Sequence, residues 1–387
     1  MTATNGSDTD GAATKRRKQD HEYQPLLPGL PDHIAQLCLS LLHPSLLFPV
    51  SRSWRRLIYS PSFPPFLSLY ALLSSSSSNP TSQIFPHQNQ NQNQIQSSNS
   101  IQFHSFDPIS SKWDLLPPPP LNLLLRHPSF ISRNLPIQSV TVSGHLVLLA
   151  ATTHHFLPAL SRPLIFNPLS NTWSFGPPIS APRRWCAAGS ARGAVYVGSG
   201  VGSHYSRDVA RSAERWDLKR DCLGWRWEKT AGPKDGRFSR EAVEAVGWRG
   251  KLCMVNVKGD AVKEGLVYDV ERDLWEEMPK GMLIGWKGAA AAMDEDVIFV
   301  VDEGKGVLRQ YNPEMDCWEE LLQSEELKGA EQIVAGGGRV CAVCAEGRGI
   351  AVVDVVARPA RLWVVDPPPA LQAVAVHILP RISRPES

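Results

Sequence analysis

The residues of this chain that could support catalysis or metal binding are few and scattered. Cys341 and Cys344 form a Cys-x-x-Cys pair inside an apolar, strand-like run, and no second pair accompanies them. Residues three apart on a strand point to opposite faces, whereas a zinc site needs four converging ligands, so we interpret both as buried cysteines. His154 and His155 are adjacent in a predicted loop and have no carboxylate neighbour that would orient them as metal ligands.

Motifs of nucleophilic and phosphate chemistry are also missing from the sequence. It has no Gly-x-Ser-x-Gly, and its runs GVGSHY and GGGRV are typical of hairpins rather than of a turn that opens a helix. The seven cysteines are scattered and odd in number, which indicates reduced thiols in the cytosol or nucleus. We therefore expect a non-catalytic protein without a metal or a cofactor.

The charge balance argues against two classes of partner. The sequence has 40 basic and 38 acidic residues and a net charge of +2, so nothing steers it globally toward nucleic acid or an anionic membrane. It has no secretory h-region and no run of apolar residues that could span a bilayer. We expect a cytoplasmic and/or nuclear protein. The basic cluster at 15–18, in a polar N-terminal arm over 1–25 that we expect to be disordered, is either a nuclear-import signal or a solvated charge run.

A short sequence unit is repeated along the chain, and its spacing shows how the rest of the chain is divided into structural repeats. FNPLSNTW, at residues 166–173, recurs as FDPISSKW, YDVERDLW and YNPEMDCW, and two looser copies fill the gaps. Each unit has an aromatic residue, then Asp or Asn, then a turn and a tryptophan. We expect the Asp or Asn side chain to cap the turn and the tryptophan to pack between neighbouring sheets. The anchor tryptophans recur every 43 to 60 residues, a period typical of propellers, and are Trp113, Trp173, Trp227, Trp275, Trp318 and Trp363.

Two further strands precede most of these units. Runs such as EAVEAVGWRGKLCMVNV consist of two β-rich segments around a Gly-containing turn, which makes four strands per repeat and predicts a propeller blade. This pattern resembles kelch repeats, although the family's Gly doublet survives only partly, as at 198–200 and 302–304. The resemblance and the strand count predict a mainly β fold, a six-bladed kelch-type propeller over residues 64–380 followed by a tail at 381–387.

The sixth blade is predicted to form from both ends of this region. The first aromatic–Trp unit lacks an upstream strand pair and has one strand before it, at 65–73, while one strand, at 371–379, remains at the C-terminus. We predict that the C-terminal strand becomes the innermost strand of this blade and closes the ring, which removes its open edges. The Ser/Asn/Gln-rich tract at 74–100 then becomes a disordered insertion between two strands.

The segment over 26–63 has a different, helical character. Pro31 and Asp32 are a helix start, apolar residues follow at helical spacing, and a second apolar-periodic segment runs from Leu46 to a stop at Pro61. Helices this short bury too little surface to be stable alone, so their apolar faces need a partner from this chain or another. Pro49 interrupts the second segment, and we expect a helix to start or kink there. Such a break would weaken contacts between this helix and a partner.

This segment resembles an F-box. Leu30-Pro31-Asp32, the aliphatic first helix and VSRSWRRLIYSPSF at 50–63 carry the resemblance. With the repeats, the chain resembles plant F-box/kelch-repeat proteins over roughly 26–380. The resemblance implies a substrate receptor of a Skp-cullin-F-box ubiquitin ligase, with cullin and RING subunits reached through a Skp-type adaptor. The alternative is a non-ligase interaction scaffold whose helices only cap the propeller. The positions that the resemblance implies for adaptor binding are Leu30, Pro31, Ile34, Leu37, Val50, Trp54 and Leu57.

The loops between repeats are the predicted place of target binding. Some kelch propellers are enzymes, but no histidine here has Asp four residues before it, as the iron-dependent specifier proteins require. Basic residues recur at the turn into the innermost strand of successive blades, and they either converge as a patch for an acidic or phosphorylated partner or are solvated loop charges. If they converge, we expect these basic residues, together with three residues of a neighbouring loop, to bind the protein target. The candidates are Arg183, Arg184, Arg240 and Lys287 at the turns and His204, Tyr205 and Arg207 in the loop.

Overall fold

The computed structural model describes residues 25–60, 62–75, 101–121, 137–151, 157–219, 224–234, 236, 238, 243–256 and 263–381. They form two compact units that divide between Pro64 and Pro65. Several features named above lie outside the described residues: the arm up to residue 24, the tract at 76–100, His154, His155, Arg240 and the tail from residue 382.

The N-terminal unit consists of three short helices. The first begins directly after Pro31, and the third is capped by Ser51, whose hydroxyl accepts a hydrogen bond of 3.1 Å from the backbone N–H of Trp54. Pro49 lies between the second and third helices, so the expected interruption is present. The helices are α1 (Asp32–Ser40), α2 (Pro44–Leu47) and α3 (Arg52–Ile58), and they enclose Ala35, Leu39, Leu47, Leu57 and Ile58.

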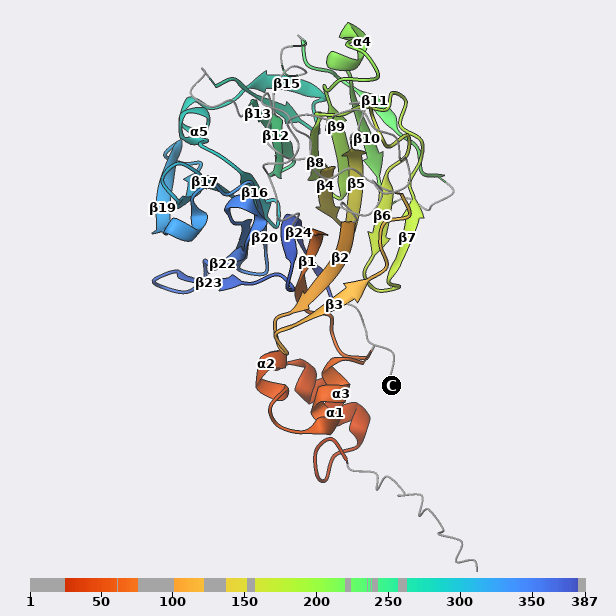
Figure 1. Ribbon diagram of the computed structural model, residues 1–387, viewed down its shortest axis with the longest axis vertical. Coiled ribbons are helices and arrows are strands. Elements are labelled where there is room, and N and C mark those ends of the chain that lie inside the picture. The colour runs from red at the N-terminus through yellow and green to blue at the C-terminus, as the bar shows by residue number, and fades with distance from the viewer. Residues whose placement is uncertain are drawn as a thin grey trace, which may run out of the picture. The chain divides into compact units, whose positions relative to one another are not determined.

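The second unit is a ring of six four-stranded antiparallel sheets (Figure 1), which confirms the predicted six-bladed propeller. We number the five blades that are continuous in sequence in chain order. Blade 1 is β4 (Ile137–Val142), β5 (His145–Ala151), β6 (Leu164–Asn167) and β7 (Thr172–Phe175), and blade 2 is β8 (Ala187–Ala191), β9 (Ala194–Gly198), β10 (Ala213–Asp217) and β11 (Glu228–Thr230). Blade 3 is β12 (Val243–Trp248), β13 (Lys251–Asn256), β14 (Gly265–Asp269) and β15 (Leu274–Glu277).

The last two continuous blades repeat the same order. Blade 4 is β16 (Ala290–Met293), β17 (Val297–Asp302), β18 (Val307–Asn312) and β19 (Cys317–Gln323), and blade 5 is β20 (Gln332–Gly336), β21 (Arg339–Val343), β22 (Ile350–Asp354) and β23 (Arg361–Val365). Short helices occupy some of the links, namely α4 (Arg207–Ala210), α5 (Lys280–Gly285), η3 (Glu325–Leu327) and η4 (Ala345–Gly347).

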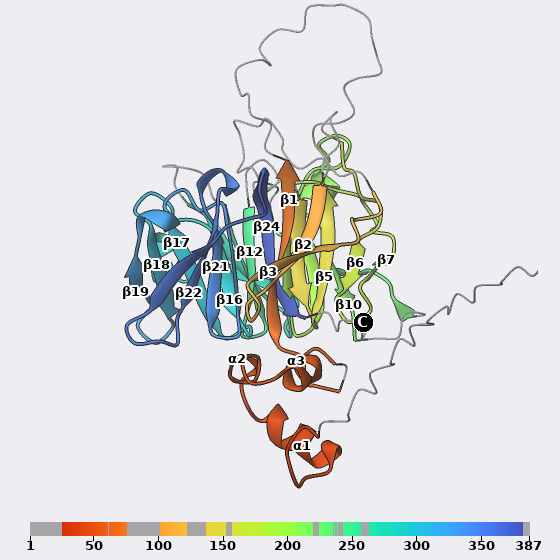
Figure 2. The same ribbon diagram turned by 60° about the horizontal axis from the view of Figure 1, so that its bottom comes forward.

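The closing blade joins the two ends of the propeller, as predicted. Its strand order is β24-β1-β2-β3, and Figure 2 shows the dark blue β24 beside the orange β1. The two strands pair from Leu67 opposite Pro380 to Ser75 opposite Leu371, and the Tyr70 hydroxyl donates 2.7 Å to the Pro380 carbonyl. The Ser/Asn/Gln tract therefore falls between β1 and β2. The strands are β1 (Leu67–Ser75), β2 (Ile101–Asp107), β3 (Lys112–Leu116) and β24 (Leu371–Pro380).

The Asp or Asn of each repeat caps a turn, as expected. Its side-chain oxygen accepts the backbone N–H two residues later in every blade, at distances between 2.9 and 3.1 Å. Because this turn fixes where the fourth strand begins, it also fixes the tryptophan that follows. The capping residues are Asp107, Asn167, Asp217, Asp269, Asn312 and Asp354.

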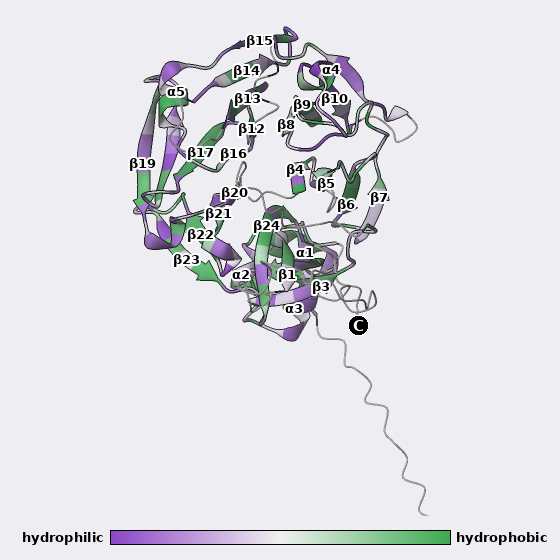
Figure 3. Cartoon of the chain, turned by 45° about the horizontal axis from the view of Figure 1, so that its top comes forward, coloured by the Kyte–Doolittle hydropathy of each residue, from purple (hydrophilic) through white to green (hydrophobic). Residues whose placement is uncertain are grey.

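Five of the six anchor tryptophans join their blade to the preceding one. The indole N–H of Trp275 donates 2.6 Å to the carbonyl of Ala231, just beyond the outermost strand of blade 2. Trp227 donates 3.1 Å to Pro177 in the same way, and Trp113 of the closing blade donates 2.8 Å to Asp366. Trp173 and Trp318 repeat the bond, whereas Trp363 makes none with a described residue. These bonds and the apolar clusters between blades hold the ring, whose innermost strands face its axis (Figure 3).

We expect Trp275→Phe to destabilise the propeller, because it removes an inter-blade hydrogen bond and leaves a void at a residue that is 7% exposed. Loss of the bond and the void together predict a fall of about 2–3 kcal/mol in the free energy of unfolding. The matched control is Trp363→Phe, since Trp363 is 43% exposed and should change stability by less than about 1 kcal/mol. Urea unfolding of the full-length chain measures both, and equal losses would contradict the anchoring role.

Candidate functional site

The helical unit leaves a stripe of large aliphatic side chains in solvent. Ile34 and Leu37 of α1 and its C-cap Leu41 follow one another at spacings of three and four residues, which places them on one face of the helix. Leu30, in the segment that precedes α1, is also exposed. Leu37 is 65% exposed and Leu41 is 86% exposed. The remaining exposed apolar residues of the unit include Leu42, Leu46 and Val50. An apolar stripe of this size on so small a unit indicates an interaction surface.

Two predicted adaptor-binding residues have structural roles instead. Leu57 belongs to the core of the helical unit and is only 5% exposed. Trp54 is half-buried, and its indole N–H donates 2.8 Å to the carbonyl of Leu26, whose own N–H bonds the Asp32 carboxylate at 3.2 Å. Trp54 therefore holds the segment before α1 in place. The other predicted positions, Leu30, Pro31, Ile34, Leu37 and Val50, are exposed.

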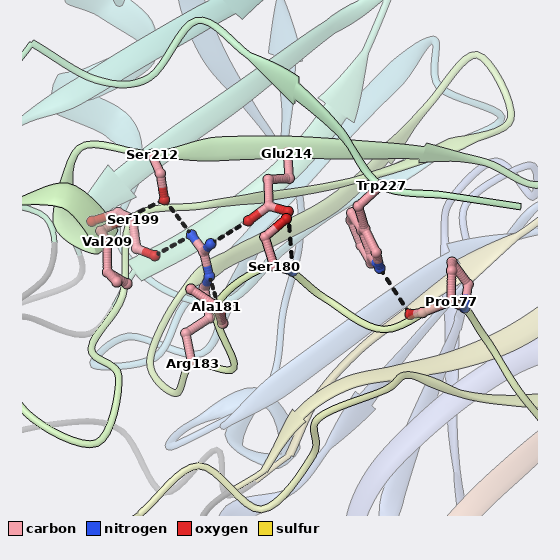
Figure 4. A network of polar contacts seen from close by, with 9 residues as sticks. All are labelled: Pro177, Ser180, Ala181, Arg183, Ser199, Val209, Ser212, Glu214 and Trp227. Carbon is pink, nitrogen blue, oxygen red and sulfur yellow. Dashed lines mark hydrogen bonds and ion pairs between the residues drawn. The ribbon is translucent and has the colours of Figure 1, made fainter.

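The structure places Arg183 in the interior of blade 2 rather than on a basic surface. Its guanidinium forms an ion pair of 2.6 Å with Glu214, and the two side chains are 1% and 3% exposed. Figure 4 shows its further hydrogen bonds, to the Ser199 carbonyl at 3.1 Å and the Ser212 hydroxyl at 2.9 Å. Because the charge is neutralised and shielded from solvent, Arg183 cannot contribute to the predicted patch.

This buried network holds the neck of a loop. Ser199 and Ser212 are the first and last residues of the link between β9 and β10, and the N–H of Ser199 also bonds the Ser212 carbonyl at 2.9 Å. Arg183 comes from the preceding link, between β7 and β8, so it ties the two links together. The loop over 199–212 is thus fixed at its base while its tip, which carries α4, remains exposed.

The predicted target-binding residues divide between this loop and separate positions. His204, Tyr205 and Arg207 lie at the exposed tip, and Arg184 lies beside its base, since Arg184 and Val201 exchange two backbone hydrogen bonds of 2.9 Å. Lys287 is exposed in the link before β16, and no contact between described residues joins it to Arg184. Four of the seven candidates, Arg184, His204, Tyr205 and Arg207, therefore belong to this loop or border its base.

The axis of the propeller is a channel of about 860 Å³, lined by the innermost strands of all six blades. Small residues such as Ala188, Ala291 and Ala375 dominate much of its wall. His377 of β24 is 2% exposed, and its Nε2 lies 3.1 Å from the Ser139 hydroxyl of blade 1. Burial lowers the pKa of His377 to about 3, so the imidazole is neutral at physiological pH.

Relatives with this organisation are known in Arabidopsis thaliana. "F-box/kelch-repeat protein SKIP25" is 48% identical, over 99% of this chain and 96% of that protein. "F-box protein AFR" is 28% identical over 72% of this chain and 69% of that protein. The chain belongs to the F-box/kelch-repeat family. In this family member the three helices correspond to the F-box and the six blades to the kelch-repeat propeller.

Other comparisons add little to the assignment. No protein-family model matches the sequence. The solved structure of YjhT aligns with a TM-score of 0.46 at 11% identity, over 68% of this chain and 91% of that chain, which is too low a likeness to support an argument.

The cysteine pair of the propeller is divided between two apolar clusters. Cys341 packs between blade 5 and the closing blade, whereas Cys344 packs between blades 4 and 5, so the two thiols do not converge, as predicted. Burial raises the pKa of the Cys341 thiol to about 12, which leaves it protonated. In the described part of the chain, no group of three His, Cys, Asp or Glu side chains could hold a metal ion, and no helix is long and apolar enough to cross a membrane.

We expect Arg183→Met to lose about 3–5 kcal/mol of stability, because it leaves the Glu214 carboxylate buried without its counter-charge. The double variant Arg183→Met/Glu214→Leu should lose less than the single variant, since it removes both charges. Arg249→Met is the control: Arg249 pairs with Asp296 in solvent, and its loss should cost no more than about 1 kcal/mol. Denaturant unfolding gives all three values, and a double variant as unstable as the single one would argue against the pair.

A second prediction concerns pH. The folded state lowers the pKa of His377 from 6.5 to about 3, so the unfolded chain binds this proton more readily between those values. Stability should be fully retained above pH 6.5 and fall by about 1 kcal/mol per pH unit below it. His377→Gln should flatten this dependence, whereas His204→Gln, at an exposed loop residue, should not. Thermal melts of the three proteins between neutral and mildly acidic pH provide the comparison.

Proposed function

We propose that this protein is the substrate-recognition subunit of a Skp-cullin-F-box ubiquitin ligase. Its helical unit docks on a Skp-type adaptor, and its propeller binds the protein to be ubiquitinated. The observation that carries the proposal is the exposed aliphatic stripe of α1, which lies in a unit that belongs to an F-box/kelch-repeat chain.

The stripe has the composition of an interface core. Its side chains are large and uncharged, and they protrude from one helix face at the spacing that groove-binding helices use. Burial of a leucine side chain in a partner contributes about 1.5–3 kcal/mol. A few such residues are enough to serve as the central anchors of a stable interface. The residues assigned to this interface are Leu30, Pro31, Ile34, Leu37, Leu41 and Val50.

The remaining predicted residues support this surface from within. Trp54 fixes the segment that ends in Leu30 and Pro31 through its bond to Leu26, and Leu57 packs in the core beneath the helices. The break at Pro49 leaves α3 with its own Ser51 cap, so the interruption is accommodated locally.

The chemistry of ubiquitin transfer is assigned to other subunits. Cullin and RING subunits, reached through the adaptor, hold the ubiquitin carrier, and the propeller brings a target lysine near it. Holding two reactants together is itself a source of rate acceleration, so the receptor needs no nucleophile or general base. This role fits a protein that acts in the cytoplasm, the nucleus or both.

We expect Leu37→Glu to weaken binding of a co-expressed Skp-type adaptor by more than about a hundredfold, because the carboxylate would be desolvated in an apolar interface. The matched control is Ile284→Glu in α5 of the propeller, since Ile284 is exposed to a similar extent and should leave adaptor binding unchanged. Affinity purification followed by calorimetric titration gives the two constants.

The rival function, a kelch interaction scaffold outside any ligase, predicts a different result. The purified wild-type chain would then fail to bind the adaptor, or Leu37→Glu and Ile284→Glu would bind it equally well. Trp54→Ala is a poor probe for this question because it also removes the bond that positions Leu26.

A further inference from the structure

The arginines of the propeller are paired unevenly. Nine described arginines of the propeller form ion pairs with carboxylates, and they occur in every continuous blade except blade 1. Arg184, Arg207 and Arg211 form no ion pair with any described residue, although all three belong to the two links that Arg183 ties together in blade 2. Other described arginines without an ion pair to a described residue, such as Arg162 and Arg361, are scattered over the propeller, whereas these three share two adjoining links.

Arg184 is held in an unusual environment. Its guanidinium lies 4.3 Å from the ring centroid of Trp185, and its Nε and Nη1 atoms are shielded from water without an acceptor. Burial lowers the pKa of Arg184, which shows that the surroundings disfavour its charge. A charged donor withdrawn from water without an acceptor is costly, so an anion at the exposed edge of the guanidinium would offset part of that cost.

The backbone around Arg184 is strained and rigid. Trp185 has φ of 53° and Ser199 has φ of 59°, a left-handed conformation that side-chain-bearing residues rarely adopt. Gly200, at φ of 96°, leaves no room for a Cβ atom, which would meet the Arg184 carbonyl at 2.9 Å. The two-way pairing of Arg184 with Val201 fixes the backbone of Arg184 against the loop, and the contact with the Trp185 ring places its guanidinium, so the group is pre-positioned.

The charges around this position favour an anionic ligand. The two links contain one carboxylate, Asp208, and a second, Glu214, follows in β10. The Glu214 charge is already neutralised by Arg183 inside the blade. The two links therefore hold one carboxylate and three arginines without an ion pair to a described residue, and His204 adds a further donor at the exposed tip. Trp185 and Tyr205 provide aromatic surface next to these donors.

We propose that Arg184, Trp185, His204, Tyr205, Arg207 and Arg211, here called the blade 2 anion surface, bind an anionic segment of the target protein. A carboxylate or phosphate group lies against Arg184, and a following apolar side chain packs on the aromatic rings. The proposal rests on the proposed function, because it assigns the target-binding role of the propeller to one surface. A protein segment is favoured over nucleic acid because the chain as a whole is nearly neutral and offers no extended basic track.

The test uses the full-length chain bound to its adaptor and fluorescence anisotropy of short peptide pools. The pools are degenerate except for a fixed centre of Glu-Glu-Leu, phosphoserine-Gln-Leu or Gln-Gln-Leu, and oligo-dT is a fourth probe. We expect one anionic pool to bind about tenfold tighter than the Gln pool, and Arg184→Gln to abolish that difference. Which anionic pool binds distinguishes a carboxylate from a phosphate.

Matched variants keep the result interpretable. Arg361→Gln, at another arginine without an ion pair but in blade 5, should leave the preference intact. Arg207→Gln should weaken it about threefold or more without affecting the fold, because the Arg207 side chain is exposed. Equal binding of all three pools, equal effects of Arg184→Gln and Arg361→Gln, or tighter binding of oligo-dT would overturn the proposal. Adaptor binding is measured separately and should survive Arg184→Gln, so failure of this surface is distinguishable from failure of the proposed function.

Discussion

The bond from an indole N–H to the carbonyl beyond the preceding blade's outermost strand is the constraint on which the propeller depends. Five anchor tryptophans make it, and the one from Trp113 to Asp366 crosses the point where the closing blade meets blade 5. A four-stranded sheet has exposed edges and two apolar faces, so it is stable here only against its neighbours. The tryptophans set the spacing between outer strands, and the loops that end each blade take their positions from that spacing.

Closure of the ring has a second requirement, the pairing of β24 with β1. This pair unites residues about three hundred positions apart, and its apolar side chains fill the clusters on both sides of the closing blade. Because the chain enters β1 at Leu67 and leaves β24 at Pro380, both ends of the propeller emerge at the same end of this blade. The long insertion between β1 and β2 begins at the opposite end, so it does not interrupt the register of the pair.

The buried ion pair of this protein, Arg183 with Glu214, stabilises the conformation of a loop. The pair of Arg183 and Glu214 is costly to bury, and its value lies in holding the link over 199–212 in one conformation. Arg184, Arg207 and Arg211, which form no ion pair with a described residue, belong to the two links that this pair ties together. The helical unit shows the same division, because the indole of Trp54 is used internally while the leucines of α1 stay exposed. Structural and recognition roles fall on neighbouring residues.

The sequence alone determined the blades, because each repeat encodes its own local structure. An Asp or Asn at the turn, a β-rich hairpin and a tryptophan at a fixed distance predict four strands wherever they recur, and the two unmatched strands predict the closing blade. The short helices and the interruption at Pro49 follow from equally local rules. The apolar spacing from Ile34 to Leu42 also indicated a face in need of a partner, although it did not show which residues remain exposed.

The tertiary structure alone decided which side chains are available. Arg183 and Arg184 are adjacent and identical in type, yet one is neutralised by a glutamate 31 positions away and the other makes no ion pair with a residue that the structure describes. Leu37 and Leu57 are both leucines at helical spacing, but only Leu37 reaches solvent. Periodicity reports the local conformation of the backbone, whereas burial and pairing depend on segments that are apart in the sequence and meet only in the folded unit. For that reason the sequence located the loops, and only the fold separated their structural residues from those free to bind.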